Sequence, residues 1–112
     1  MSALPDIAAA RKRAAELEAM MNAPDFYDDR RRAAEISAEH ARLAEIVALH
    51  EKCAAALRAL EENREIADDA EADAELRALA EEEIPQLEKD AESLRAALTA
   101  AMIPPEPTDS RN

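Results

Sequence analysis

Residues 36–60 read ISAEHARLAEIVALHEKCAAALRAL. Two rows of mostly apolar side chains recur in this stretch at a spacing of seven: Ile36, Leu43, His50 and Leu57 in one, and Ile46, Cys53 and Leu60 in the other. A repeat of seven is the heptad pattern of helices that pack side by side along a narrow seam. No proline interrupts it, so one helix is predicted over residues 29–66, about 55–60 Å long. That length is typical of a coiled-coil arm.

The segment before this helix predicts a shorter helix over residues 6–21. Asp6 follows Pro5 and is a suitable N-cap, because its carboxylate can accept from the first free backbone N–H groups. Asn22 is expected to take the left-handed cap conformation that glycine often supplies. Pro24 cannot continue the helical hydrogen bonds and ends the segment.

A third helix is predicted over residues 73–101, after a reversal of the chain. Residues 67–75 hold no large apolar side chain, so we interpret them as the reversal; the alternative is a helix that runs straight through. Pro85 predicts a kink near residues 81–85, with a break into two helices as the alternative. One apolar stripe follows the third helix: Leu76, Ala80, Ile84, Leu87, Ala91, Leu94, Leu98 and Met102.

These segments predict an all-α fold. It is a long antiparallel helical hairpin with the shorter N-terminal helix packed alongside, forming one helical domain over residues 1–103. Residues 104–112 are expected to form an extended, proline-rich exit. The composition agrees: of the 112 residues 29 are alanine, the best helix former, and none is glycine. Without glycine, a Walker loop, a dinucleotide fingerprint and a nucleophile elbow are excluded. Only 25 apolar residues are larger than alanine, which suits narrow seams and an elongated shape.

The charge is unevenly distributed. The net charge is −12, and residues 61–92 account for −11 of it, with 14 acidic and 3 basic side chains. Such a chain cannot bind nucleic acid through one broad basic face. The single cysteine, Cys53, cannot form an internal disulfide, and the sequence has neither a membrane-length apolar run nor a signal peptide. We therefore expect a cytoplasmic protein with no membrane partner.

Catalytic or metal-binding side chains are not evident. His40 and His50 belong to no His-Glu-x-x-His or Glu-x-x-His motif, because Ser37 and Val47 stand where the glutamates would be. We interpret His50 and Cys53 as seam residues. No catalytic residue, cofactor, metal or small-molecule substrate is therefore expected, and the protein is not expected to be an enzyme.

Two basic triplets are the candidate contact residues: Arg11, Lys12 and Arg13, and Arg30, Arg31 and Arg32. Three consecutive residues spread over about 200° of a helix surface, so neither triplet forms one flat patch. One interpretation is that these side chains pair with nearby acids within the chain. The other is that they contact phosphates of structured RNA or an acidic protein.

The C-terminal residues carry a family resemblance. After Leu98 the long helix ends and the chain continues as Pro104-Pro-Glu106-Pro107-Thr-Asp109-Ser-Arg111-Asn112. This ending resembles the Pro-x-Asp-Pro-x-Asp-x-Arg-Asn run of bacterial class I peptide chain release factors, with Glu106 in place of the usual Asp. Two further stretches resemble the same family in order and spacing: Ala80, Glu83, Ile84 and Leu87, and Pro24-Asp25-Phe26 followed by Glu39, Leu43, Ile46 and Val47.

The resemblance spans essentially the whole chain. The exit is more similar to release factor 1, which reads UAA and UAG, and Phe26-Tyr27 is more similar to release factor 2; the former is favoured. In this family the matching region is the N-terminal helical domain. It implies a ribosome partner, at the base of the large-subunit stalk, made of rRNA and protein. The class II release-factor GTPase is a second candidate partner.

The resemblance also implies that the codon-reading domain and the Gly-Gly-Gln loop for peptidyl-tRNA hydrolysis follow Asn112 in a longer protein. No catalytic or codon-reading residue is then present here. The six basic residues of the two triplets are the candidate ribosome contacts. The alternative is a freestanding coiled-coil adaptor or homodimer with no role in translation.

Overall fold

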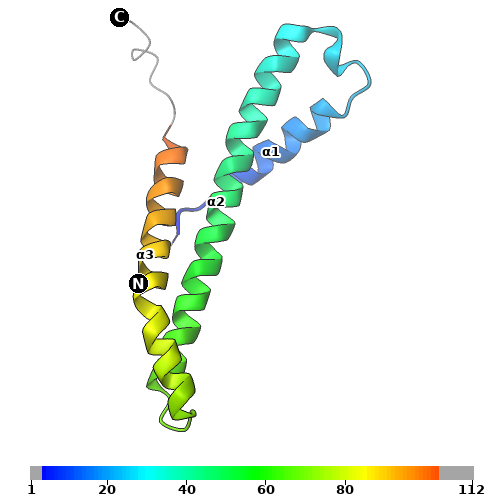
Figure 1. Ribbon diagram of the computed structural model, residues 1–112. Helices are drawn as coiled ribbons and strands as arrows, with labels where there is room; N and C mark the ends of the chain where they lie inside the picture. Colours follow the sequence, from blue (N-terminus) through cyan, green and yellow to red (C-terminus); the bar gives the residue numbers. More distant parts are fainter. Residues whose placement is uncertain (1–3, 104–112) are drawn as a thin grey trace, which may run out of the picture.

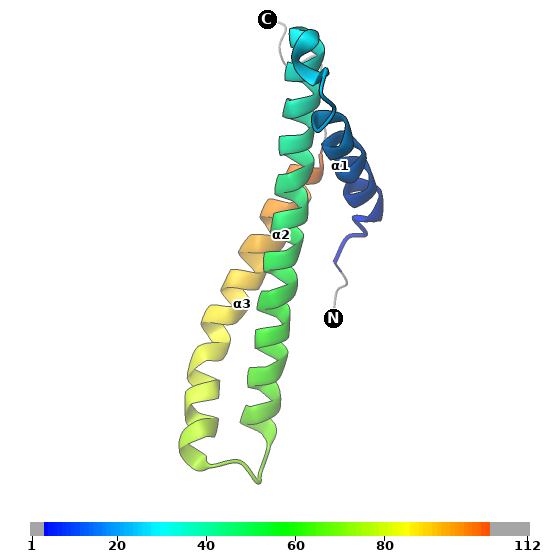
Figure 2. The same ribbon diagram turned by 90° about the vertical axis from the view of Figure 1, so that its right-hand side faces the viewer.

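The fold is all-α, as the sequence predicts. A computed structural model describes residues 4–103, which form helix α1 (Ala8–Met21), a 3-10 turn η1 (Phe26–Asp28), and helices α2 (Arg30–Asp68) and α3 (Ala74–Met102). Helices α2 and α3 form a long antiparallel hairpin, and α1 and α3 lie on either side of α2 (Figures 1 and 2). The predicted exit at residues 104–112 lies outside the described residues.

The reversal falls in the acidic stretch where it was expected. Helix α2 ends at Asp68, two residues later than predicted, and α3 begins at Ala74, so the alternative of a continuous helix is wrong. Asp69 holds the turn: its carboxylate accepts from the Glu71 backbone N–H at 2.9 Å, and its carbonyl accepts from the Ala72 N–H at 3.1 Å. A short acidic side chain is well suited to such a turn.

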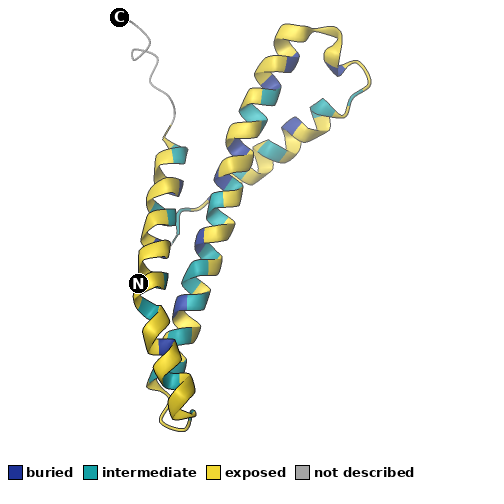
Figure 3. Ribbon diagram, viewed as in Figure 1, coloured by how far each residue is buried: buried dark blue, intermediate teal, exposed yellow. Residues whose placement is uncertain are grey.

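The hairpin is held by a narrow seam of small and medium side chains. Ile46, Cys53 and Leu60 of α2 are buried, together with Ala80, Ala91 and Leu98 of α3 (Figure 3). The Cys53 sulfur lies 3.8 Å from the carbonyl oxygen of Ala91, so the two backbones approach closely at that level. The other heptad row is less buried, because His50 and Leu57 are only half-buried.

A second group of buried side chains fixes α1 against the first half of α2. Leu17 of α1 and Phe26 of η1 are almost completely buried in a cluster with Ile36 and Leu43 of α2. Leu98 of α3 belongs to the same cluster, which therefore joins all three helices. The result is an elongated molecule with a radius of gyration of 20.0 Å. A compact domain of this size would have about 13 Å.

The ends of α1 differ in detail from the prediction. The helix begins at Ala8 instead of residue 6, and its N-cap is Ile7, so the prediction of Asp6 as the N-cap is wrong. The Asp6 carboxylate nevertheless accepts from the Ala8 N–H at 2.9 Å, one residue before the cap. The left-handed conformation expected at Asn22 is wrong, because its φ is −87° and its ψ is −4°. Asn22 instead donates its N–H to the carbonyls of Glu18 and Ala19, which tightens the last turn.

Helix α3 continues through Pro85, so a break there is wrong. Figure 1 shows the helix axis changing direction in the yellow part of α3, as expected for a proline inside a helix. The predicted stripe is also wrong at its start, because Leu76 is 47% exposed. At this end Ala80 is buried and Arg77 is half-buried. The Arg77 Nε donates to the Ala72 carbonyl of the reversal at 3.3 Å.

We predict that Leu98→Ala destabilises the fold by about 2–5 kcal/mol, because it leaves a cavity in the cluster shared by all three helices. Leu79→Ala on the same helix is the matched control. Leu79 is 52% exposed, and its truncation should change the free energy of unfolding by no more than about 0.5 kcal/mol. Urea unfolding followed by circular dichroism measures both. Equal effects of the two substitutions would contradict this description of the core.

Candidate nucleic-acid interface

The first basic triplet lies on α1, and two of its members are paired with acids of α2. The Arg13 guanidinium donates from Nε to Glu39 Oε2 at 3.0 Å and from Nη2 to Glu39 Oε1 at 3.2 Å. A two-bond fork of this kind is among the stronger ion pairs. The Arg11 Nη1 lies 3.6 Å from Glu51 Oε2, farther along α2. For these two arginines the interpretation as pairs within the chain is confirmed.

The Arg13–Glu39 pair shifts the pKa of both side chains. The hydrogen bond from Arg13 lowers the pKa of Glu39 below its ordinary value, with partial burial opposing and the positive charges of Arg13 and Arg42 adding to the effect. The same bond raises the pKa of Arg13. His40 Nε2 of α2 lies 3.7 Å from Glu18 Oε2 of α1. These polar contacts join α1 to α2 beside the apolar cluster, so Arg13 acts in positioning α1.

Lys12 differs from its neighbours. It is exposed, and within residues 4–103 no carboxylate lies at salt-bridge distance from its ammonium group. Of the first triplet, Lys12 is therefore the member whose charge is available to an external anion.

The second triplet, Arg30, Arg31 and Arg32, forms the first turn of α2. The Asp29 carboxylate caps this turn by accepting from the Arg32 backbone N–H at 3.1 Å. Arg31 approaches Glu35 at 3.8 Å, but the two side chains are 91% and 70% exposed, so water screens the pair. In the described part of the chain no acid lies within 4.0 Å of the guanidinium groups of Arg30 and Arg32.

The position of this triplet adds to its positive potential. The N-terminus of a helix carries a partial positive charge, and the first turn of α2 contains no acidic residue. Three arginines there are unfavourable for the isolated helix and favourable for a bound anion. Asp29 already caps this turn, so a phosphate group would be bound by the arginine side chains and not by the backbone N–H groups.

Tyr27 is an exposed aromatic residue that was not among the predicted contact residues. Its neighbour Phe26 is 2% exposed and packs in the core, whereas Tyr27 is 73% exposed. The two rings meet edge to face with centroids 4.8 Å apart. The adjacent aromatic pair was the available signal, because a short turn that buries one ring directs the other outward. An exposed aromatic ring beside arginines is typical of surfaces that stack RNA bases.

Only some residues of the two basic triplets lie near one another. A cleft of about 550 Å³ between α1 and the start of α2 has three basic side chains on its walls, Arg13, Arg31 and Arg32, together with three acidic ones, Asp29, Glu35 and Glu39. Arg11 instead lies beside Glu51, and 21 residues of helix separate Glu51 from Arg30, which is about 31 Å. We call Tyr27, Arg30, Arg31 and Arg32 the basic end.

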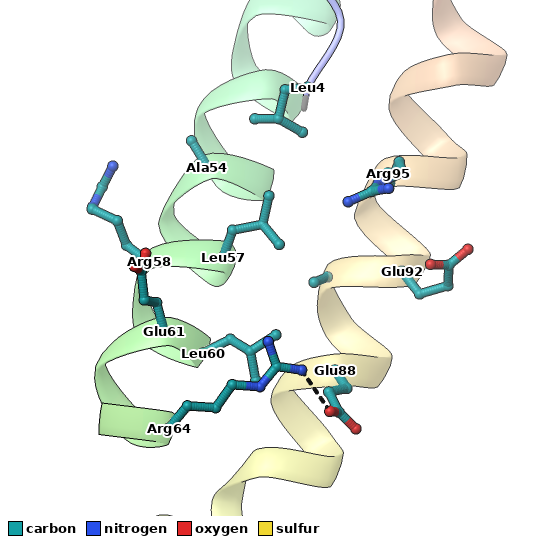
Figure 4. A pocket seen from close by; sticks show the side chains of 11 residues that line it. Leu4, Ala54, Leu57, Arg58, Leu60, Glu61, Arg64, Glu88, Glu92 and Arg95 are labelled. Carbon is teal, nitrogen blue, oxygen red and sulfur yellow. Dashed lines mark hydrogen bonds and ion pairs between the residues drawn. The ribbon is translucent and has the colours of Figure 1, made fainter. Parts of the chain in front are cut away.

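A second groove lies between α2 and α3 (Figure 4). It measures about 790 Å³ and has an apolar floor that includes Leu57 and Leu60, into which Leu4 reaches from the N-terminal segment. Arg64 Nη2 pairs with Glu88 Oε2 at 2.8 Å across it. Charges of both signs surround the groove, so it does not favour an anion.

The described residues were also compared with the requirements of a metal site, a reactive cysteine and a membrane-spanning helix. Over residues 4–103 no three His, Cys, Asp or Glu side chains are grouped so that they could hold a metal ion. Cys53 is buried, and His50 is half-buried on the seam. None of the helices in the described range is both long and apolar enough to span a membrane.

Known proteins resemble the chain over its whole length. Residues 10–112 match the family model described as the PCRF domain. Peptide chain release factor 1 of Akkermansia muciniphila is 37% identical over 112 residues, which are 100% of this chain and 31% of that protein. The protein of that name from Lactobacillus gasseri is 33% identical over 97 residues, 87% of this chain and 26% of the relative.

A third relative, peptide chain release factor 1 of Chlamydia trachomatis, is 34% identical over 98 residues, 88% of this chain and 27% of its own length. The chain thus spans about a third or less of the curated relatives it matches. No solved structure gives a significant match.

We predict that Arg13→Gln raises the pKa of Glu39 toward its ordinary value of 4.5, because the carboxylate loses its strongest donor. The lowered pKa means that the pair stabilises the fold fully above pH 4.5 and loses this effect as the pH falls through the lowered value. NMR titration of the Glu39 carboxyl group measures the change. Arg31→Gln is the control and should leave Glu39 unaffected; an unchanged Glu39 titration in Arg13→Gln would contradict the pairing.

Proposed function

We propose that this chain, which belongs to the PCRF domain family of peptide chain release factors, positions a translation termination factor on the ribosome. The observation that carries the proposal is the basic end: arginines without strong acidic partners begin a long helix in a chain whose relatives are named peptide chain release factor 1. The activity of the whole protein, stop-codon recognition and peptidyl-tRNA hydrolysis in the cytoplasm, is part of the proposal. No catalytic step is assigned to the residues of this chain.

The proposed mechanism is positioning by shape and charge. Helix α2 has 39 residues and is about 58 Å long, so a contact at its first turn is held far from the hairpin tip. Arginines at the basic end would bind rRNA phosphates, and Tyr27 would stack on an unpaired base. Arg13 would contribute indirectly, by holding α1 and η1 against α2 through Glu39.

The partner proposed for this surface is the rRNA and protein at the base of the large-subunit stalk, with the class II release-factor GTPase as a second partner. Of the six basic residues in the two triplets, Arg30, Arg31, Arg32 and Lys12 are proposed as contacts. Arg11 and Arg13 are proposed to be structural, because their guanidinium groups are paired with α2. The alternative of a coiled-coil homodimer loses support, since the heptad row of Ile46, Cys53 and Leu60 is buried within the chain itself.

We predict that the triple substitution Arg30→Glu, Arg31→Glu and Arg32→Glu weakens binding to large ribosomal subunits by at least about tenfold, because three phosphate contacts are lost. The salt dependence of binding should become shallower. Co-sedimentation at several salt concentrations measures both.

The matched control changes three other exposed cations by the same total charge: Lys52→Glu, Arg58→Glu and Lys89→Glu. This variant should retain most of its affinity. An equal loss in the two variants would assign the effect to overall charge. Absence of binding by the unmodified chain at low salt would overturn the proposed function.

We also predict that Tyr27→Ala weakens subunit binding by about 1–3 kcal/mol, the typical value for one base stacked on an aromatic ring. Tyr27→Phe keeps the ring and should bind normally. Tyr27→Phe keeps the edge-to-face contact with Phe26 and should not change the thermal midpoint of unfolding, whereas Tyr27→Ala loses this contact and should lower the midpoint slightly. Equal binding by all three proteins would remove Tyr27 from the interface.

A further inference from the structure

The outer end of the hairpin buries much less than the part next to it. We call residues 61–84 the tip; they comprise the end of α2, the reversal and the start of α3. Within the tip Ala80 is the one buried residue, and Leu76 and Leu79 are 47% and 52% exposed. By contrast, residues 43–60 of α2 include four buried side chains. The two arms of the tip are therefore held together by a much smaller apolar contact than the rest of the hairpin (Figure 3).

Pro85 marks the boundary between the tip and the rest of α3. It has no N–H group to donate to the carbonyl of Glu81, so the helical hydrogen bonds of α3 are interrupted there. The axis of α3 changes direction in the same region (Figure 1). One turn beyond Pro85, Glu88 Oε2 pairs with Arg64 Nη2 of α2 at 2.8 Å, but the Arg64 and Glu88 side chains are 54% and 50% exposed, so water screens this ion pair. The tip is therefore only weakly coupled to the rest of the hairpin.

The tip also carries most of the negative charge of the chain. It contains 11 acidic and 2 basic side chains, a net charge of −9 out of −12. Glu62 and Glu65 on α2 and Glu82 on α3 are exposed, and within residues 4–103 no basic group lies at salt-bridge distance from their carboxylates. The Debye length falls from about 30 Å at about 0.01 M salt to about 3 Å at about 1 M. At low salt the acids on the two arms therefore repel one another, and dissolved cations relieve this repulsion.

Each arm of the tip is a weak helix on its own. Residues 74–84 are 11 residues of α3, fewer than the roughly 12–15 that an isolated helix needs in water, and Pro85 limits support from the rest of the helix. Residues 61–68 end α2 with no basic residue in the last turn, so Glu65 and Asp68 face the negative end of the helix dipole. If the arms separate, both are expected to unwind while the buried part of the hairpin stays packed.

We propose that the tip opens and closes as a unit, independently of the buried part of the hairpin, with Pro85 at the boundary and the concentration of cations setting the balance. Low salt favours the open tip, because separation of the arms lowers the repulsion between their acids. High salt favours the closed tip, because the small apolar contact then outweighs the screened repulsion. This salt-sensitive switch follows from the burial and charge of α2 and α3 alone, and it does not depend on the proposed function.

Hydrogen exchange of the whole chain at several NaCl concentrations tests the proposal. Amides of residues 61–84 should exchange at least about a hundredfold faster than those of residues 43–60, each relative to the unfolded chain at the same salt, because the tip opens without global unfolding. Raising NaCl from about 0.01 M to about 1 M should slow exchange in the tip by about tenfold. Equal protection of the two segments, or exchange in the tip that salt leaves unchanged, would overturn the proposal.

A conservative substitution in the buried part separates local from global opening. Ile46 is 3% exposed, and Ile46→Val should speed the exchange of residues 43–60 by about twofold to tenfold, because these amides exchange only when the buried contacts break. Exchange in the tip should be unchanged, since opening of the tip leaves Ile46 buried. An equal acceleration in the tip would mean that the tip opens only together with the whole fold, which contradicts its independence.

The boundary is tested by Pro85→Ala. This change supplies an N–H group to the Glu81 carbonyl and should slow exchange in the tip by about tenfold. The matched control is Gln86→Ala, which alters the adjacent exposed residue and should change the exchange of the tip by less than about twofold. Equal effects of the two substitutions would refute Pro85 as the boundary.

The role of charge is tested by neutralising three acids of the tip. Glu62→Gln, Glu65→Gln and Glu82→Gln together should slow exchange in the tip by at least about threefold at about 0.01 M NaCl and weaken its response to salt. The control, Asp25→Asn with Asp28→Asn and Glu45→Gln, removes three exposed acids outside the tip and should keep the full response. The same loss of response in both variants, or in neither, would show that the acids of the tip do not set the balance.

Discussion

The close approach of α2 to α3 through small side chains is the constraint on which the rest of the structure depends. With 25 apolar residues larger than alanine, the chain cannot build a thick core, and it buries a narrow seam instead. Ala80 and Ala91 let the backbones come together, as the contact between the Cys53 sulfur and the Ala91 carbonyl illustrates. With so narrow a seam, more apolar surface can be buried only by lengthening the helices, because each added helical turn contributes one more small contact. The elongated shape and the wide separation of the two ends follow directly from it.

Helix α1 packs against the first half of α2 and so makes the hairpin a three-helix domain. Its packing combines the burial of Leu17 and Phe26 with the fork between Arg13 and Glu39. The apolar part supplies most of the stability, and the polar part sets how α1 lies along α2. Burial of Phe26 also orients the short turn that exposes Tyr27. The same contacts that hold α1 therefore shape the surface proposed to bind RNA.

The separation of charge along the rod makes its two ends chemically different. Arginines gather at the first turn of α2, and acids gather around the reversal and the start of α3. The two ends of the rod therefore differ in net charge, and the length of α2 holds them far apart (Figure 1).

The sequence by itself determined the helices, the reversal and the seam, because these follow from local periodicity, from a run without large apolar residues, and from the positions of proline. It also identified both basic triplets. It could not determine that Arg13 pairs with Glu39, 26 residues away, whereas Arg30 and Arg32 have no such acid. Nor could it determine that Tyr27 is exposed to solvent. Leu76 was predicted as the first residue of the buried apolar stripe of α3, and the structure exposes it. These features depend on the rotation of one helix against another, and that rotation is set by contacts between distant residues. Only the tertiary structure decided which charged and apolar side chains remain available to a partner.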